Sequence, residues 1–81
     1  MNYDDAARLL NRVGYAVIGN EVRCDGLHVG DVWQIPGGFE ACTVGGEPFW
    51  FNTREQATAW LLLETSPTAM AEFVRMGSPD V

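Results

Sequence analysis

The residues of this chain that have the chemistry for catalysis are few and scattered. Its single histidine, His28, lies four residues after Cys24 in a glycine-flanked turn region, so a thiol–imidazole pair forms only if the turn folds the two together. An active site also needs a group that orients the base, and nothing near His28 in the sequence completes such a triad. We therefore expect His28 to be an exposed loop residue.

The same region contains side chains of the types that bind metals. Their spacing matches neither the Cys-x-x-Cys nor the His-x-x-x-His pattern that orients ligands in advance. The sequence therefore predicts no metal site, and we expect the cysteines to be small apolar residues rather than a disulfide. The candidate ligands considered are Cys24, Asp25, His28 and Cys42.

A pair of carboxylates and two pairs of glycines are the remaining residues whose types could do chemistry. Glu40 and Glu47 could face each other near a hairpin, and paired carboxylates can act as acid and base. Strand alternation accounts for both more simply as solvated outer-face residues. The glycine pairs at 37–38 and 45–46 do not precede a helix as phosphate-binding loops do. We expect a chain that is not an enzyme and uses no cofactor.

The first element that must position these residues is an N-terminal helix. Asn2 suits the N-cap, and Asp4 and Asp5 fall in the first turn, where the helix dipole favours negative charge. Apolar residues then recur at helical spacing as far as Val13.

From residue 15 the hydrophobic pattern changes to that of short strands. Gly19-Asn20 is a two-residue hairpin signal, and Asp25-Gly26 predicts the next turn. Gly45-Gly46 predicts a second hairpin, because glycine tolerates the positive φ of a primed turn. We expect about four short antiparallel strands. Strand segments are predicted at 15–18, 21–24, 39–44 and 47–51, and the segment 29–35 could add another.

Two helices follow the strands. Asn52 and Glu55 resemble a capping box that starts the first of them. This helix is apolar over much of its circumference, which is typical of a helix sandwiched between two layers. Ser66 can cap the last helix, with Pro67 at its first position. Segregated strands and helices predict a single α+β domain over residues 1–77, with the C-terminal helices packed on one sheet face and a frayed tail at 78–81.

Length and charge exclude several classes of protein. The chain has 81 residues, 11 acidic and five basic, and a formal net charge of −6; the basic residues are all arginine. An acidic chain without lysine cannot neutralise a phosphate backbone, so we expect no direct contact with nucleic acid. No apolar segment is long enough to span a membrane, and the N-terminus carries acid where a signal peptide carries positive charge. We expect a soluble, cytoplasmic protein with no membrane contact.

The deficit of positive charge belongs mainly to the strand region. Residues 24–53 contain no arginine. If Phe49 and Phe51 point at the helices, Trp50 points to the other face, and Trp33 joins it if its strand has the matching register. Trp50 can instead be covered by the C-terminal helix or by a second copy of the chain, so burial and interface both stay open. The acids of this region are Asp25, Asp31, Glu40 and Glu47.

An acidic surface that carries tryptophans predicts a non-enzymatic binding module for a basic surface of another protein. Tryptophan is enriched at interface hot spots, and complementary charge speeds association. The targets best matched are nucleic-acid-binding proteins, whose phosphate site the acids would occupy. In size and charge alone, the chain is similar to phage-encoded inhibitors of bacterial defence, including anti-CRISPR proteins, and this resemblance implies an inhibitor. The candidate binding residues are Asp25, Asp31, Trp33, Glu40, Glu47 and Trp50.

Two alternatives stay open. The first is a small-molecule or regulatory domain with an aromatic pocket between sheet and helices. The second concerns self-association. We expect a homodimer as often as a monomer, because the core is small and an edge strand of the sheet is left unpaired. The pocket would be built from Trp33, Phe39, Trp50 and Trp60.

Overall fold

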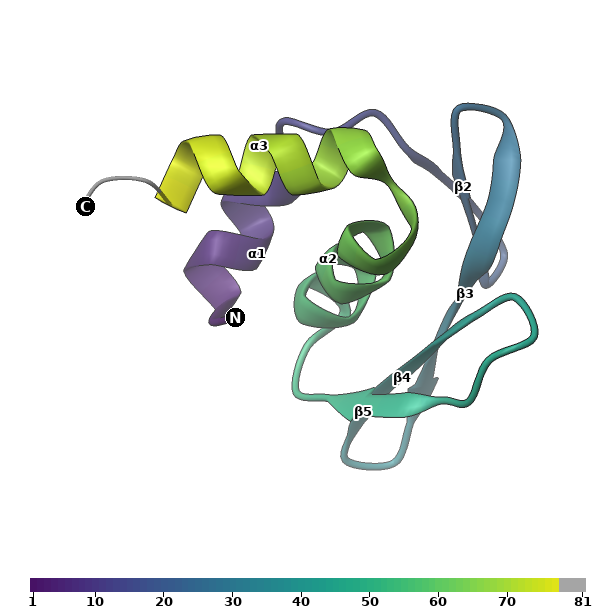
Figure 1. The fold of residues 1–81 in the computed structure, drawn as a ribbon. Coiled ribbons are helices and arrows are strands. Elements are labelled where there is room, and N and C mark those ends of the chain that lie inside the picture. Colours follow the sequence, from purple (N-terminus) through teal and green to yellow (C-terminus); the bar gives the residue numbers. More distant parts are fainter. Residues whose placement is uncertain (78–81) are drawn as a thin grey trace.

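The structure, a computed structural model that describes residues 1–77, has three helices on one side of an antiparallel five-stranded sheet (Figure 1). The α+β class and the order of a helix, a sheet and two helices are confirmed. The tail expected at 78–81 lies outside the described residues. The elements are α1 (Tyr3–Leu10), β1 (Ala16–Ile18), β2 (Glu21–Cys24), β3 (Leu27–Ile35), β4 (Gly38–Thr43), β5 (Phe49–Phe51), α2 (Arg54–Thr65) and α3 (Pro67–Gly77).

Helix α1 begins at the cap that the sequence predicts. The Asn2 side chain accepts a hydrogen bond of 2.8 Å from the Asp5 backbone N–H, which satisfies a donor that the helix leaves unpaired. Asp4 and Asp5 lie in the first turn, and Asp5 forms an ion pair with Arg8 one turn later. The helix ends at Leu10.

The sheet has one strand more than the expected number of about four. The strands lie in chain order, β1-β2-β3-β4-β5, so each pair of neighbours is consecutive in the sequence. Asp25 and Gly26 both have positive φ (56° and 79°), as a type I′ turn requires. Because this turn is only two residues long, β3 begins at Leu27, earlier than the segment predicted from residue 29. Strand β3 pairs with β2 on one side and β4 on the other.

The last hairpin differs from the prediction. Strand β4 ends at Thr43 and β5 begins only at Phe49, so Glu47 lies in a loop and not in a strand opposite Glu40. Pro48 explains the later start, since proline has no N–H to donate to a sheet ladder. Gly45 still makes the turn, with a φ of 80°.

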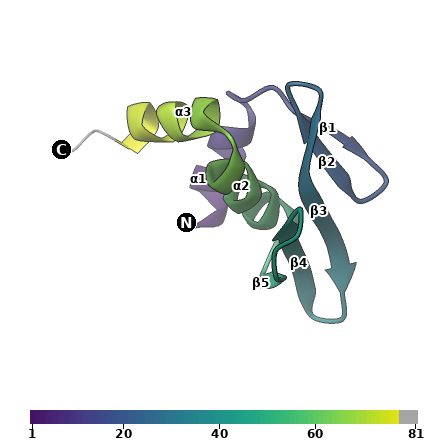
Figure 2. The same cartoon turned by 45° about the vertical axis from the view of Figure 1, so that its right-hand side comes forward.

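Helix α2 lies between the sheet and the other two helices, as its all-round apolar pattern predicts (Figure 2). It packs against β3, β4 and β5 on one side and against α1 and α3 on the other. Ala57, Ala59, Leu61 and Leu62 of α2 have no exposed surface. None of the helices in residues 1–77 has the length and apolar character needed to cross a bilayer.

Helix α2 approaches the sheet closely at Gly30. A Cβ at this position would overlap the Cys42 carbonyl oxygen and the Leu61 side chain. Gly30 thereby lets Leu61 lie directly on β3. The same face of the sheet presents Val22 and Val32, which are buried, so the helix-facing side of the sheet is apolar.

The N-cap of α2 is Thr53, one residue later than the predicted Asn52. The Thr53 hydroxyl accepts a hydrogen bond of 3.1 Å from the Gln56 backbone N–H. Thr53 and Gln56 have the spacing of a capping box. They are therefore as suitable for starting the helix as the predicted pair of Asn52 and Glu55. The sequence therefore offers two overlapping caps, and the path of the chain out of β5 selects between them.

The position of this cap gives a first prediction. Thr53→Ala removes the acceptor for the Gln56 N–H and should lower the free energy of unfolding by about 1 kcal/mol. Asn52→Ala, the matched control one residue earlier, should change it by less than about 0.5 kcal/mol. Urea unfolding followed by circular dichroism measures both. Equal losses in the two variants would contradict the assignment of the cap to Thr53.

A second prediction concerns the contact between α2 and the sheet. Gly30→Ala should lower the free energy of unfolding by about 2 kcal/mol, because the new methyl group overlaps the Cys42 backbone carbonyl oxygen and also forces Leu61 away from β3. Gly14→Ala is the matched control, since nothing lies within 4 Å of a Cβ there and its φ is not positive. The control should be neutral or slightly stabilising. A Gly30→Ala protein as stable as the control would refute the close approach.

Candidate functional site

The outer face of the sheet, which the helices leave uncovered, carries a row of three residues across β3, β4 and β5. The register pairs Trp33 with Glu40 and Glu40 with Trp50, and residues directly opposite each other project from the same face. The Trp33 indole Nε1–H donates a hydrogen bond of 3.2 Å to Glu40 Oε1. We call these three residues the Trp–Glu–Trp row. It joins two aromatic rings and one carboxylate from three strands.

Phe49 and Phe51 lie on the opposite face of β5 from Trp50, as strand alternation requires. Both rings contact Trp60 of α2: the ring centroid of Trp60 lies 5.1 Å from that of Phe49 and 5.4 Å from that of Phe51. Trp50 keeps 53% of its surface exposed, so the C-terminal helix does not bury it.

A second acid adjoins the row on β3. Asp31 lies two residues before Trp33, opposite Cys42 of β4 and Glu21 of β2. Asp31 and Trp33 therefore project from the same face, because strand residues two apart share a face. The outer face thus carries three carboxylates, from Glu21, Asp31 and Glu40.

Two of these carboxylates, Glu21 on β2 and Asp31 on β3, have an arginine or histidine neighbour. Arg23 Nη2 donates to Glu21 Oε1 at 3.1 Å, and His28 Nε2 lies 3.2 Å from Asp31 Oδ1. A β-bulge between β2 and β3 makes the second contact possible: it shifts the register beside Arg23 and so brings His28 to the face of Asp31. Sequence reasoning missed this pair, because a bulge changes the alternation on which it depends.

Charge compensation therefore weakens across the outer face from β2 to β4. Glu40 accepts from the Trp33 indole, and in residues 1–77 no basic side chain lies within ion-pair distance of it. On the helical side, Glu72 pairs with both Arg12 and Arg75, at 3.7 and 2.9 Å. Asp4, Glu55 and Glu64 on the helices also make no ion pair among the described residues, so Glu40 is distinguished by its place between two tryptophans.

The other two predicted binding acids lie outside the row. Asp25 occupies the turn between β2 and β3, and Glu47 the loop between β4 and β5. Both are exposed, at the end of the sheet where β3 begins and β4 ends. The structure thus groups Asp31 with the Trp–Glu–Trp row and leaves Asp25 and Glu47 in separate loops.

The groups considered for catalysis or metal binding do not converge. Cys24 is buried on the helix-facing side, where its thiol lies 3.4 Å from the Gly14 carbonyl oxygen, whereas His28 lies on the outer face. Cys24 and Cys42 are free thiols, and Cys42 is only half-buried. The described part of the chain has no cluster of three or more potential metal ligands.

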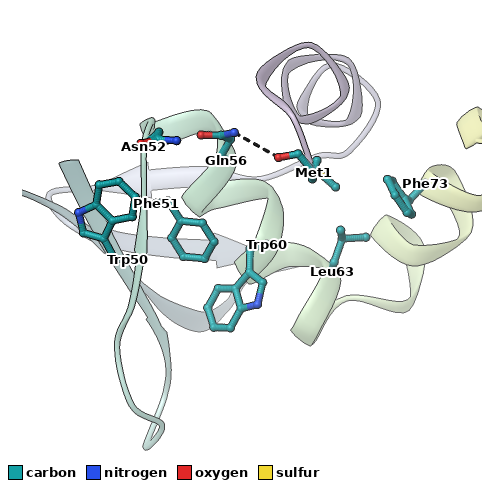
Figure 3. A pocket seen from close by; sticks show the side chains of 8 residues that line it. All are labelled: Met1, Trp50, Phe51, Asn52, Gln56, Trp60, Leu63 and Phe73. Carbon is teal, nitrogen blue, oxygen red and sulfur yellow. Dashed lines mark hydrogen bonds between the residues drawn. The ribbon is translucent and has the colours of Figure 1, made fainter. Parts of the chain in front are cut away.

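A pocket of about 440 Å³ opens beside β5, above the exposed side of α2 (Figure 3). Of the four aromatic residues expected to form a pocket, it includes Trp50 and Trp60 and excludes Trp33 and Phe39. Trp33 projects from the outer face, and the Phe39 ring lies under the Arg54 guanidinium, 4.9 Å from its centre. The remaining apolar lining comes from Met1, Phe51, Leu63 and Phe73.

The polar lining of the pocket is largely engaged within the protein. The Gln56 side chain donates to the Met1 carbonyl oxygen at 3.1 Å and accepts from the Thr53 hydroxyl at 3.1 Å. These bonds tie the N-terminus to α2 and shape one wall. Asn52, the other polar lining residue, is exposed. The pocket is therefore mainly an apolar surface, assembled from the N-terminus, β5, α2 and α3.

The exposure of the row gives a third prediction. Trp50 should be the tryptophan most accessible to a neutral quencher, since the other two are half-buried. Trp50→Phe should therefore lower the acrylamide Stern–Volmer constant of the protein, and Trp33→Phe, the matched variant in the same row, should raise it. A larger fall in the Trp33→Phe protein would contradict this arrangement.

Comparison of the chain with protein-family models, curated proteins and solved structures finds no match.

Proposed function

We propose that this chain is a non-enzymatic protein-binding module whose outer sheet face occupies a basic site on a partner protein. The observation that carries the proposal is the Trp–Glu–Trp row, in which two tryptophans flank a carboxylate that has no basic neighbour within ion-pair distance in the described residues. Asp31 extends the acidic surface along β3.

The chemistry of the row matches a cationic partner. An arginine or lysine that reaches Glu40 can also lie over the face of an indole, where the ring quadrupole attracts a cation. Tryptophan contributes large, rigid contact area, and complementary charge raises the association rate. The indole hydrogen bond to Glu40 holds the carboxylate in place before a partner arrives. A partner would therefore meet an acidic site that is already ordered.

A basic surface patch is typical of proteins that bind nucleic acid, because it neutralises phosphates. The partner we propose is a nucleic-acid-binding protein, with the chain as an inhibitor that competes for its phosphate site. The similarity in size and charge to phage-encoded anti-defence proteins, including anti-CRISPR proteins, supports this class of inhibitor. The net charge of −6 acts against direct nucleic-acid binding by the chain itself.

The second candidate function is binding of a small apolar molecule. The pocket beside β5 favours it, since about 440 Å³ falls within the size range of small-molecule pockets. Trp50 and Trp60 line this pocket, so such a ligand should change tryptophan fluorescence. The protein-binding function is preferred because the polar lining that would orient a small molecule is largely engaged by Thr53 and Met1.

The proposed function is tested by charge reversal on the row. Glu40→Lys should weaken capture of basic proteins from a host lysate by about tenfold, a loss of roughly 1.4 kcal/mol, and Glu47→Lys in the loop should have a smaller effect. Asp4→Lys makes the same change of charge on α1 and should leave capture intact. The captured proteins, identified by mass spectrometry, should be released by duplex DNA at low salt.

Circular dichroism provides the control that each reversed variant is folded. Capture that is unchanged by Glu40→Lys, or reduced equally by Asp4→Lys, would show that the row is not the binding surface.

A further inference from the structure

The free edge of β5 adjoins both the Trp–Glu–Trp row and the pocket. Strand β5 is the last strand of the sheet, and within residues 1–77 its only strand partner is β4. The backbone groups on its outer edge are therefore free to pair with an added strand. Phe49 and Trp50 on this strand are each more than half exposed, at 54% and 53%. The unpaired edge of β5 therefore carries exposed hydrophobic side chains on both faces of the strand.

A strand added to β5 would lie across the pocket. Figure 3 shows Trp50 and Phe51 at one side of the pocket and Phe73 at the other, with Trp60 and Leu63 of α2 between them. Trp60 contacts the ring of Phe51, so the inner face of β5 continues directly onto α2. The added strand would be the sixth of the sheet, and it would cover the apolar side chains of the pocket that β5 leaves exposed.

Strand alternation then specifies the pattern of the added strand. Side chains on its inner face would enter the pocket between Phe51, Trp60 and Leu63, and the next ones along would project beside Trp50, on the face that carries Glu40. The first set must be apolar and the second set should be basic. We propose that the edge of β5 binds an extended segment of the partner protein in which apolar and basic residues alternate, by β-strand addition.

This inference rests on the proposed function, because the basic character of the occupant comes from it. Charge also decides between a partner segment and a second copy of the chain. Each copy carries −6, so pairing of two β5 edges brings together two acidic proteins, whereas a basic segment is attracted to the same edge. The opposite edge of the sheet, β1, exposes Val17 and Ile18 but is not part of the pocket. Strand addition is therefore assigned to β5.

The probe is a dye-labelled, end-capped peptide of about seven residues in which valine and arginine alternate, a length typical of a strand. Its matched control has the same composition, with the valines in one block and the arginines in another. The alternating peptide should bind at least about tenfold more tightly than the block peptide in fluorescence anisotropy, because only alternation separates the apolar and basic faces. It should also slow hydrogen exchange of the amides of residues 49–51.

Two variants place the peptide at the edge of β5. Leu63→Arg puts a cation in the pocket and should weaken the alternating peptide by about tenfold or more. Ile18→Arg makes the same change on the exposed edge strand β1 and should alter binding by less than about twofold. Both should retain the circular dichroism of the parent protein, since Ile18 is exposed, and Leu63, which packs partly against the core, borders the open pocket where the longer side chain can extend.

Several results would overturn the strand-addition proposal. Equal binding of the two peptides would mean that charge alone acts, which leaves the outer-face proposal intact. Hydrogen exchange at residues 49–51 that the peptide leaves unchanged would also refute it. So would a dimer, detected by light scattering without peptide, that already protects the β5 amides from exchange. In contrast, peptide binding that depends on Leu63, together with protein capture unaffected by Glu40→Lys, would refute the outer-face function and leave the edge site standing.

Discussion

The rest of this structure depends on the packing of α2, which is buried against the sheet on one side and against α1 and α3 on the other. Leu61 lies on β3 because Gly30 has no side chain, and Leu62, also fully buried, belongs to the same helix. Alanine at positions 57 and 59 keeps the helix narrow where neighbouring elements approach. Without α2, the apolar face of the sheet and the apolar sides of α1 and α3 would have no common partner.

This arrangement explains why one sheet face stays open. In residues 1–77 all three helices lie on the same side of the five strands, so the outer face of the sheet carries no helix (Figure 1). The open face must therefore be compatible with water and still carry strand residues that pair well. The Trp33–Glu40 hydrogen bond meets both needs, because it satisfies the indole N–H and joins β3 to β4. Trp33 and Glu40 both stay partly exposed, so a partner can still reach them.

Local features of the fold were predictable from sequence to different degrees. The Asn2 cap and the two turns at 19–20 and 25–26 depend on neighbouring residues alone, and they appear as expected. The start of β5 lies later than predicted, because the glycine pair at 45–46 predicts a tighter hairpin than Pro48 permits. The contact between His28 and Asp31 was missed because the bulge beside Arg23 breaks the period of two. Errors thus occurred where a neighbouring strand or a single irregular residue overrides the local pattern.

The sequence by itself determined the class of fold, the acidity of the strand region and the alternation that separates Trp50 from Phe49 and Phe51. These properties follow from residue types and short-range periodicity. Only the tertiary structure decided that Trp33, Glu40 and Trp50 form one row, that Trp50 is exposed, and that the pocket includes Met1 and Phe73. Each of these depends on strand register or on helix packing. Residues far apart in the chain set both, through contacts that no local pattern encodes.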